Sequence, residues 1–377
     1  MDLFDWTLLI LTTCYSASTL GFLLALFLPE IRPRNTSQPF ISIVIAARNE
    51  ARYIQTCLET ITTQTYPKDR YEVIVVDDNS EDETALIIQN FSALDATVSC
   101  HTVGNRFPEM AAKKRPLSVG IKEARGEIIL TTDADCRVPP TWVEGIAKYF
   151  QPDTGTVIGF SQIKSKGSAQ GFFERLQALD FLVLMTASAA STKLGIPLAA
   201  TGQNLAYRKS LFEGVGGFSP IADRPSGDDV LLLQLLKNAG KDVVFAEDPS
   251  TFVSTWRAET PSGFWQQRRR WASNAFTQLR LNPAFFGYTV IVFLVNLVLP
   301  AALAVGIMSG AYGLPLACLS LKIAGDMLVT LKGAKKFDRL DLIGVFPIWE
   351  LLQAPYIVLV AMASLFTGYT WKGIKHK

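Results

Sequence analysis

The sequence predicts an α/β protein with an open, largely parallel sheet, attached to helices that cross a membrane. Two observations carry this prediction: short β-branched runs alternate with helical segments in the middle of the chain, and uncharged apolar blocks lie near both ends. Of the 377 residues, 49% are hydrophobic and only 19% are charged, so part of the chain is expected to lie in lipid. The length corresponds to about two domains.

The sheet is predicted from β-branched runs that end in polar residues. We expect strands over 41–47, 71–78 and 126–132, with helical segments between them, and further strands over 156–162 and 243–248. Such a βαβαβ order places helices on both faces of the sheet. Ligands of these sheets bind beyond the carboxyl ends of the strands. The stretches AARNE, DDNS and TTDAD all fall at such ends, so their side chains should converge on one crevice.

Four apolar blocks are long enough to cross a hydrocarbon core of about 30 Å at ~1.5 Å per residue. They cover 6–28, 286–308, 312–331 and 342–366. The first has no basic segment before it and no small-residue cleavage site, which favours a retained anchor over a signal peptide. A fifth apolar stretch, 181–200, is rich in Ala, Ser and Thr and contains a lysine. We interpret it as a buried or membrane-skimming helix.

Basic residues beside these blocks predict how the chain is oriented, because cytoplasmic loops carry an excess of Lys and Arg. They place the middle of the chain in the cytoplasm, and they are Arg32, Arg34, Arg268, Arg269, Arg270, Arg280, Lys332, Lys335, Lys336 and Arg339. The basic tail over 372–377 breaks the pattern if the fourth block crosses. Either this tail is an exception, or the block, which contains Pro347, Glu350 and Pro355, does not cross fully. We favour four spans in an integral protein of the cell inner membrane.

These features divide the chain into four segments. An N-terminal anchor covers 1–35, the α/β domain 36–260, an interfacial segment 261–285 and the C-terminal membrane region 286–377.

Composition argues against several classes of function. The net charge is +2, and no basic stripe interleaved with aromatics appears in the α/β segment, so nucleic acid is not an expected partner. Only His101 and His376 are present, and the five cysteines form no C-x-x-C pair, so we expect neither a His-based triad nor structural zinc. Acid–base chemistry therefore falls to carboxylates.

Acidic residues follow two predicted strands and precede one helix. Asp78 ends the second strand, where an acid either caps the next helix or accepts a hydrogen bond from a nucleotide. Asp133 and Asp135 form either an acidic turn or part of a magnesium or manganese site, because these ions prefer oxygen ligands. Asp228 and Asp229 begin an apolar helix, and they are either capping charges or a general base for an attacking hydroxyl.

Two further patterns lie near or within the membrane blocks. The run FWQQRRRW over 264–271 is either a basic belt beside the membrane or a set of cations for a departing diphosphate, with Trp271 as a wall for an acceptor. Lys322 and Asp326 lie four residues apart in the third block. Charges within a membrane are costly, so mutual pairing is the simplest explanation, and contact with a lipid head group is the alternative.

The order of these motifs resembles the membrane-bound family 2 glycosyltransferases. A strand ending in A-R-N-E is followed by V-V-D-D, D-A-D, G-x-N-x-A-Y-R, G-D-D and Q-x-x-R-W within about 38–275. The resemblance implies a GT-A fold, flanking spans, and inverting transfer from a UDP-sugar to a lipid or saccharide acceptor with Mg²⁺ or Mn²⁺. Ceramide glucosyltransferases, small bacterial lipid glycosyltransferases and polysaccharide synthases share this arrangement.

The resemblance also implies which residues bind the donor. They are Ala46, Arg48, Glu50, Asp78, Lys113, Asp133, Gln267, Arg270 and Trp271. Ala46 stands where the family commonly has proline, so we carry over only a backbone contact there. Arg48 and Glu50 would line the uridine pocket with Ala46, and Asp78 would bind the uracil.

The remaining roles concern the metal, the acceptor and the base. Asp135 would be the main metal ligand, and Asp133 would contact both metal and ribose. Gly202 and Asn204 would border the acceptor together with Trp271. Asp229 would be the catalytic base, with the catalytic-pair residue Asp228 standing where the family has glutamate.

The leading hypothesis is transfer of one sugar to a membrane lipid. A processive polysaccharide synthase also carries Q-x-x-R-W, but an extruding channel usually needs more helices than the three predicted after the α/β domain. A non-catalytic membrane scaffold would be unaffected by Asp229→Asn. A two-metal phosphotransferase or nuclease would use D-x-D but would leave Q-x-x-R-W unexplained.

Overall fold

The computed structural model describes residues 3–30, 35–164, 171–366, 368–371 and 374–376. Arg32, Arg34, Lys372 and Lys377, which contribute to the predicted orientation, lie outside the described residues. The chain divides into two compact units. The sheet unit comprises 29–167 and 192–256, and the helical unit comprises 1–28, 168–191 and 257–377. The segment 168–191 thus groups with the helices, although it lies within the predicted α/β segment.

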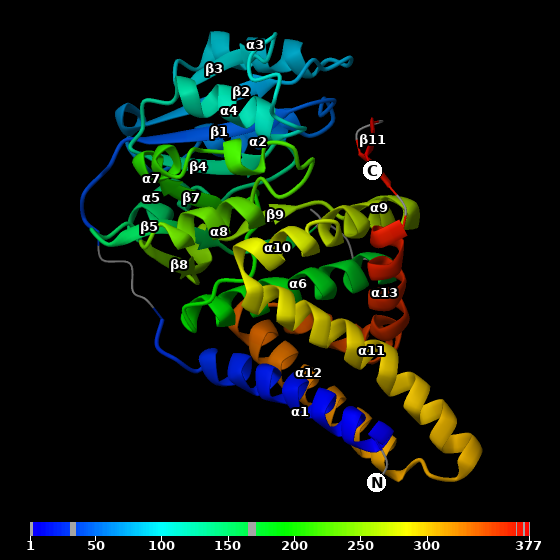
Figure 1. The fold of residues 1–377 in the computed structure, drawn as a ribbon. Coiled ribbons are helices and arrows are strands. Elements are labelled where there is room, and N and C mark those ends of the chain that lie inside the picture. The colour runs from blue at the N-terminus through cyan, green and yellow to red at the C-terminus, as the bar shows by residue number, and fades with distance from the viewer. Residues whose placement is uncertain (1–2, 31–34, 165–170, 367, 372–373, 377) are drawn as a thin grey trace. The chain divides into compact units, whose positions relative to one another are not determined.

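A seven-stranded sheet organises the sheet unit (Figure 1), with strand order β3-β2-β1-β4-β7-β5-β8. Its strands are β1 (Ile41–Ala47), β2 (Tyr71–Asp77), β3 (Val98–Thr102), β4 (Ile128–Asp133), β5 (Thr154–Gly159), β7 (Leu205–Arg208) and β8 (Asp242–Ala246). The predicted strands are confirmed. β3 and β7 were not expected. β7 runs antiparallel between β4 and β5, whereas the other pairings are parallel.

Short helices pack on this sheet because β-branched strand residues leave both faces apolar. They are α2 (Ile54–Thr62), α3 (Thr84–Leu94), α4 (Lys114–Glu123), α5 (Trp142–Ala147), α7 (Lys209–Gly214) and α8 (Val230–Asn238). A two-stranded pair, β6 (Ser161–Ile163) with β9 (Val253–Thr255), completes the unit. Helix α4 lies so close to the sheet that a Cβ at Gly120 would approach Val44 Cγ1 to 2.5 Å.

The register of the parallel strands brings three strand ends to one edge. Ala47 pairs with Asp77 across β1 and β2, and Ala46 pairs with Asp133 across β1 and β4. The predicted convergence of AARNE, DDNS and TTDAD is therefore confirmed. The edge where these strands end is called the carboxyl edge below.

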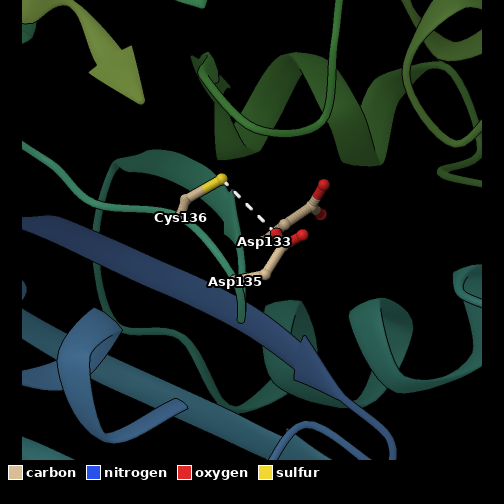
Figure 2. A group of neighbouring side chains, drawn as sticks. All are labelled: Asp133, Asp135 and Cys136. Carbon is tan, nitrogen blue, oxygen red and sulfur yellow. Dashed lines mark hydrogen bonds between the residues drawn. The ribbon is translucent and has the colours of Figure 1, made fainter. Parts of the chain in front are cut away.

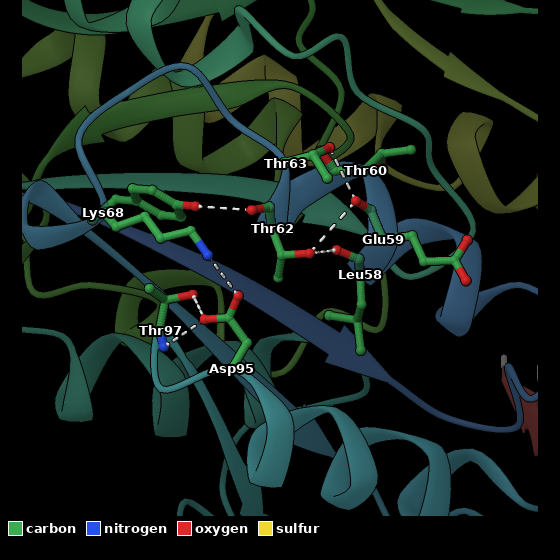
Figure 3. A network of polar contacts seen from close by, with 9 residues as sticks. Leu58, Glu59, Thr60, Thr62, Thr63, Lys68, Asp95 and Thr97 are labelled. Atoms are coloured by element: carbon green, nitrogen blue, oxygen red, sulfur yellow. Dashed lines mark hydrogen bonds and ion pairs between the residues drawn. The ribbon is translucent and has the colours of Figure 1, made fainter.

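At the other end of β2, polar contacts join the segment between α2 and β2 to the segment that follows α3 (Figure 3). Lys68 Nζ lies 3.0 Å from Asp95 Oδ2, and Asp95 Oδ1 accepts hydrogen bonds from the backbone and hydroxyl of Thr97. The Tyr71 hydroxyl donates to the Thr62 carbonyl. These contacts fix the start of β2, and they lie at the strand end opposite the acidic motifs.

The helical unit contains four helices that are long and apolar enough to cross a membrane. They are α1 (Leu3–Ala25), α11 (Pro283–Ser309), α12 (Gly313–Lys336) and the stretch Leu340–Phe366, which comprises the 3₁₀ segment Leu340–Val345 and α13 (Phe346–Phe366). These helices indicate an integral membrane protein. The unit also holds most of α6 (Phe172–Lys193), with α9 (Pro261–Ala272), α10 (Ala275–Leu281) and the hairpin of β10 (Tyr369–Trp371) and β11 (Ile374–His376). As predicted, α6 is not among the candidate spans.

The charged pair in α12 is part of a buried network. Lys322 Nζ lies 2.8 Å from Asp326 Oδ2 and 2.6 Å from Glu350 Oε1 of α13. It also donates to Gln353, and Asp326 accepts a hydrogen bond from Tyr15 of α1. Pairing between Lys322 and Asp326 is therefore confirmed. Because a charge in an apolar bundle needs partners, this network links α1, α12 and α13.

Candidate active site

The loops after β1 and β2 are tied together at the carboxyl edge. The backbone N–H of Asn49 donates to Ser80 Oγ at 3.0 Å, and the N–H of Glu81 donates to Asn49 Oδ1 at 2.8 Å. Asn49 adopts a left-handed φ of 53°, which asparagine tolerates better than most residues. The N–H of Glu50 donates to Thr84 Oγ1 at 2.7 Å. The residues Arg48 and Glu50, which are predicted to bind the sugar donor, therefore lie on the loop after β1. Hydrogen bonds fix this loop to the segment that follows β2.

The two acids at the end of β2 have different surroundings. Asp77 is buried and accepts the backbone N–H of Ser80, which lies in the turn before α3, so this contact is not a cap of that helix, which begins at Thr84. Asp78 lies 3.7 Å from an Arg48 nitrogen. Burial raises the pKa of Asp78, although Arg48 and Arg115 act in the opposite direction. Asp78 is thus the acid of this pair that faces a cation at the strand ends.

The acidic turn after β4 brings three possible ligand groups together (Figure 2). One oxygen each of Asp133 and Asp135 and the sulfur of Cys136 lie within 4.8 Å of one another. The Cys136 thiol donates to Asp135 Oδ1 at 3.7 Å. Burial and the two neighbouring carboxylates raise the pKa of Cys136, so the sulfur is held as a thiol. The cluster therefore offers two carboxylates, which are oxygen ligands of the kind that Mg²⁺ and Mn²⁺ prefer.

Lys113 connects this turn with the acids before α8. Its Nζ contacts Asp133 Oδ1 and lies 3.4 Å from Asp228 Oδ2. The nearby carboxylates outweigh the effect of burial and raise the pKa of Lys113, so its ammonium stays charged. The predicted donor residue Lys113 therefore contacts one predicted metal ligand and one residue of the predicted catalytic pair.

Asp228 and Asp229 are presented by a tight turn at the start of α8. Gly227 has a φ of +89°, and a Cβ there would lie 2.5 Å from Leu231 Cγ, so the turn requires glycine. Asp229 Oδ1 accepts the N–H of Val230 at 2.6 Å, and Asp229 Oδ2 accepts the N–H of Gly202 at 3.2 Å. Burial and the charge of Asp228 raise the pKa of Asp229 to about 6. Asp229 is both a helix cap and a carboxylate poised to take a proton near neutral pH.

Gly202 and Asn204 lie in one segment but differ in surroundings. A Cβ at Gly202 would lie 3.0 Å from Lys113 Nζ and 3.3 Å from Asp228 Oδ2, so this position borders the charged cluster. Asn204 is fully buried. Its amide donates to two backbone carbonyls, at 3.0 and 2.8 Å, and accepts from Trp142 Nε1 at 2.9 Å. These contacts hold the side-chain amide of Asn204 against the surrounding backbone and Trp142, and its place at the border of an acceptor site stays a prediction.

The predicted residues Gln267, Arg270 and Trp271 lie on α9, in the helical unit, and all three are half-buried. The sequence motif does not distinguish Arg268, Arg269 and Arg270, but their surroundings in the structure differ. Arg268 is buried, with a nitrogen 2.5 Å from Asp180 Oδ2 and its guanidinium 4.2 Å from the Trp271 ring centroid. Arg269, also buried, donates to the Gly368 carbonyl.

The burial of Arg268 could have been predicted from the spacing of the aromatic residues around it, which the motifs above do not take into account. Phe264 precedes it by four residues and Trp271 follows it by three, which places both aromatics on its face of the helix. Its guanidinium lies 4.7 Å from the Phe264 ring centroid. The side chains of Arg268 and Arg269 therefore make their contacts within the helical unit, Arg268 with Asp180 and aromatic rings and Arg269 with the Gly368 carbonyl.

Known proteins that are similar to this chain include glycosyltransferases. The family model described as Glycosyl transferase family 2 matches residues 42–216. Similar curated proteins include the probable glycosyltransferase YdaM of Bacillus subtilis, which is 29% identical over 272 residues, 69% of this chain and 61% of that protein. The beta-monoglucosyldiacylglycerol synthase of Trichormus variabilis is 25% identical over 274 residues, 71% of this chain and 55% of that protein.

A third relative is named for a different product. The poly-beta-1,6-N-acetyl-D-glucosamine synthase of Staphylococcus epidermidis is 27% identical over 237 residues, 62% of this chain and 53% of that protein. The chain spans between about half and two thirds of the length of these three curated relatives.

Among solved structures, the chain is similar to the mannosyltransferase PcManGT from Pyrobaculum calidifontis, in complex with GDP-Man and Mn²⁺. The TM-score is 0.62 at 22% identity, covering 97% of this chain and 99% of that one. At this identity the similarity concerns the fold. With the strand order of the sheet, it identifies the α/β domain as one of the GT-A fold, and residues 42–216 of this domain match the family 2 glycosyltransferase model.

Proposed function

We propose that this protein transfers one sugar from a UDP-sugar to a membrane lipid, with inversion and with a divalent metal ion, at the cytoplasmic face of the membrane. The observation that carries the proposal is the chain of contacts among Asp133, Lys113, Asp228 and Asp229 at the carboxyl edge of a family 2 domain. It puts a candidate metal ligand and a candidate base within one charged cluster.

The donor is proposed to bind at the ends of β1, β2 and β4. The half-buried Ala46 offers backbone, and Arg48, Glu50 and Asp78 surround the same strand ends. Asp78 suits the imide N–H of uracil, because a carboxylate accepts such a hydrogen bond. Guanine also presents a ring N–H, so donors that carry either base must be compared.

The residues of the turn after β4 fit a divalent ion. Asp133 and Asp135 supply two oxygen ligands, and the ordinary ligands of magnesium in such sites are one or two carboxylates with substrate phosphates. A bound Mg²⁺ or Mn²⁺ would neutralise negative charge that develops on the departing diphosphate. Lys113 adds a fixed positive charge to the same cluster.

Asp229 is the proposed base. It takes the proton of the acceptor hydroxyl as that oxygen forms a bond to the anomeric carbon, and the bond from that carbon to the diphosphate breaks with its electron pair leaving on the diphosphate. Attack from the face opposite the leaving group inverts the anomeric centre. The hydrogen bonds from Val230 and Gly202 hold the carboxylate, and burial together with the charge of Asp228 raises its pKa to about 6.

A lipid acceptor is favoured by the apolar helices and by similarity to a protein named beta-monoglucosyldiacylglycerol synthase. Gln267, Arg270 and Trp271 are proposed to approach the donor diphosphate and the acceptor from α9. The second candidate is a polysaccharide synthase, which the Staphylococcus epidermidis relative supports. The small number of apolar helices after the family 2 domain favours single transfer.

A donor screen tests the proposal. Purified protein with Mg²⁺ or Mn²⁺ and total membrane lipid receives UDP-glucose, UDP-galactose, UDP-N-acetylglucosamine or GDP-mannose in turn. We expect release of UDP from one donor and a lipid carrying one added sugar by mass spectrometry, with neither signal from Asp229→Asn. A long polymer would support the synthase instead. Consumption of no nucleotide sugar would contradict an enzymatic role.

A further inference from the structure

The segment before α4 is fastened to the turn before α8 at several points. The N–H of Ala111 donates to the Ala222 carbonyl at 2.9 Å. Lys114, the first residue of α4, contacts the Arg224 carbonyl through Nζ and donates to the Ser226 carbonyl at 3.0 Å. These contacts lie on the segment that ends in Asp228 and Asp229.

The position of Lys114 is unfavourable for a lysine in two ways. Its side chain is fully buried, and burial of an ammonium group costs free energy unless it is well bonded. It also stands at a helix N-terminus, where the helix dipole disfavours positive charge. Both costs need a compensating role, and the two carbonyls are the hydrogen-bond partners found for its ammonium in the described part of the chain.

We propose that Lys114 is a positioning residue, whose ammonium holds the 224–226 backbone so that the turn at Gly227 presents Asp229 to the acceptor. The role rests on the proposed function of Asp229 as the base. Lys113, its neighbour, contacts the side chains of the acidic cluster, whereas the hydrogen bonds of the Lys114 ammonium among the described residues go to backbone carbonyls of the loop. Lys113 thus supplies positive charge to the acidic cluster, whereas Lys114 holds the backbone that carries Asp228 and Asp229.

The charge of Lys114 titrates in an accessible range. Burial lowers its pKa to about 8, although the carboxylates of Asp228, Asp229 and Asp223 act against this shift and Arg224 adds to it. As pH rises through about 8, the Lys114 ammonium loses a proton. Its hydrogen bonds to the carbonyls of Arg224 and Ser226 are then no longer strengthened by a positive charge. The loop should therefore loosen at alkaline pH.

Kinetics of Lys114→Met test the role, with Lys122→Met as the control because Lys122 is an exposed lysine of the same helix. We expect Lys114→Met to lower kcat about 10²-fold with the donor KM unchanged, since small misplacements of a catalytic group cost that much. The wild type should lose activity above about pH 8, and Lys114→Met should lack this limb. An unchanged kcat, or an alkaline limb that persists, would overturn the role.

Hydrogen exchange on the wild type provides a test that needs neither turnover nor a folded variant. After correction for intrinsic rates, peptides covering 222–230 should lose protection between pH 7 and pH 9, whereas peptides from β4 should not. Equal behaviour of both peptides would overturn the clamp even if the protein is an active transferase. Loss of protection in a protein with no transferase activity would instead refute the proposed function alone.

A separate observation concerns α13, the last apolar helix. Near its start, Trp349 Nε1 donates to Asp180 of α6 at 3.2 Å. Farther along, the ring of Tyr356 stacks on Phe264 of α9, with centroids 5.8 Å apart. Beyond its last residue, the Gly368 carbonyl accepts a hydrogen bond from the α9 side chain of Arg269. The beginning, middle and far end of α13 therefore all lie beside α6 and α9.

This packing bears on which side of the membrane the chain ends. Neither α6 nor α9 is a candidate span, and α9 carries the basic run that precedes α11. The 21 residues of α13 extend about 30 Å. A helix of that length that crossed the membrane would leave its far end at the face opposite α9.

We infer that α13 does not cross the membrane and that the C-terminus stays on the side of α9. Helices α1, α11 and α12 are then the three crossings. The basic tail falls on the cytoplasmic side, so the exception to the positive-inside rule disappears. The inference is independent of any catalytic activity.

Reporter fusions to the full chain test it. Green fluorescent protein at the C-terminus should fluoresce, and alkaline phosphatase at the same position should be inactive, because the former matures in the cytoplasm and the latter outside it. Alkaline phosphatase inserted after Ser309, at the end of α11, serves as the control and should be active. An active phosphatase at the C-terminus would overturn the inference.

Discussion

Lys113 Nζ lies 3.4 Å from Asp228 Oδ2 and also contacts Asp133, so one ammonium joins the end of β4 to the turn before α8. The two carboxylates come from segments that are distant in the sequence, and Gly202 leaves room for the contact. This relationship couples the proposed metal ligands to the proposed base, because the charge of Lys113 acts on both.

Asp135→Ala should abolish metal-dependent turnover and leave the fold intact. Asp135 is half-buried in a turn, and its carboxylate is one of the two that the ion would share. Turnover against Mn²⁺ concentration, with circular dichroism for the fold, makes the measurement. Asp69→Ala, at a carboxylate that is 81% exposed, is the control. Metal-supported activity in Asp135→Ala at the wild-type level would return this stretch to an ordinary acidic turn.

The pH profile should report Asp229. Its pKa is raised to about 6, and the base must be ionised, so kcat/KM should fall as pH falls through about 6. Asp228→Asn removes a like charge that raises this pKa, so the acid limb should move to lower pH. Asp229→Asn should lose about 10²- to 10⁴-fold in kcat, the usual contribution of a general base. An acid limb that stays in place in Asp228→Asn would contradict the assignment.

Lys113→Met should move the same acid limb in the other direction. The charge of Lys113 lowers the pKa of Asp229, so its removal should raise that pKa and shift the limb to higher pH. Donor KM should also rise, because a cation beside the proposed metal ligands is lost. Lys122→Met is again the matched control. A shift to lower pH would show that Lys113 does not act on the base through its charge.

Lys322→Met should destabilise the helical unit. The substitution leaves Asp326 and Glu350 buried without their cation, and breaking such a pair typically costs about 3–5 kcal/mol. Thermal unfolding in detergent makes the comparison, with Lys335→Met, an exposed position of the same helix, as the control. Equal midpoints for the two variants would mean that the network contributes little to the packing of α1, α12 and α13.

Some of the architecture is visible in sequence because local rules decide it. The β-branched runs at 41–47 and 71–78 have the length and composition of buried strands, and the parallel order then brings their ends together. β7 escaped prediction because Leu205–Arg208 is too short to show a period, and its antiparallel pairing is set by its neighbours. Local sequence therefore specifies the strand ends but not every strand between them.

In the candidate site too, the residues of the motifs could be predicted from sequence, whereas the contacts between them could not. The acids at 133, 135, 228 and 229 could be named from motifs, but the contact of Lys113 with Asp228 depends on the tertiary fold. The burial of Asn204 likewise depends on Trp142, which arrives from α5. The carbonyl contacts of Lys114 have no sequence signature, because a backbone partner leaves none.

The anomeric configuration of the product tests the central claim most directly. Common UDP-sugars carry an α-linkage, and displacement assisted by the single base Asp229 gives a β-glycoside. The proton coupling constant of the purified product, measured by nuclear magnetic resonance, distinguishes the two anomers. We expect a β-linked lipid monoglycoside from the wild type, formed about 10²- to 10⁴-fold more slowly by Asp229→Asn. An α-linked product would contradict inversion by one carboxylate.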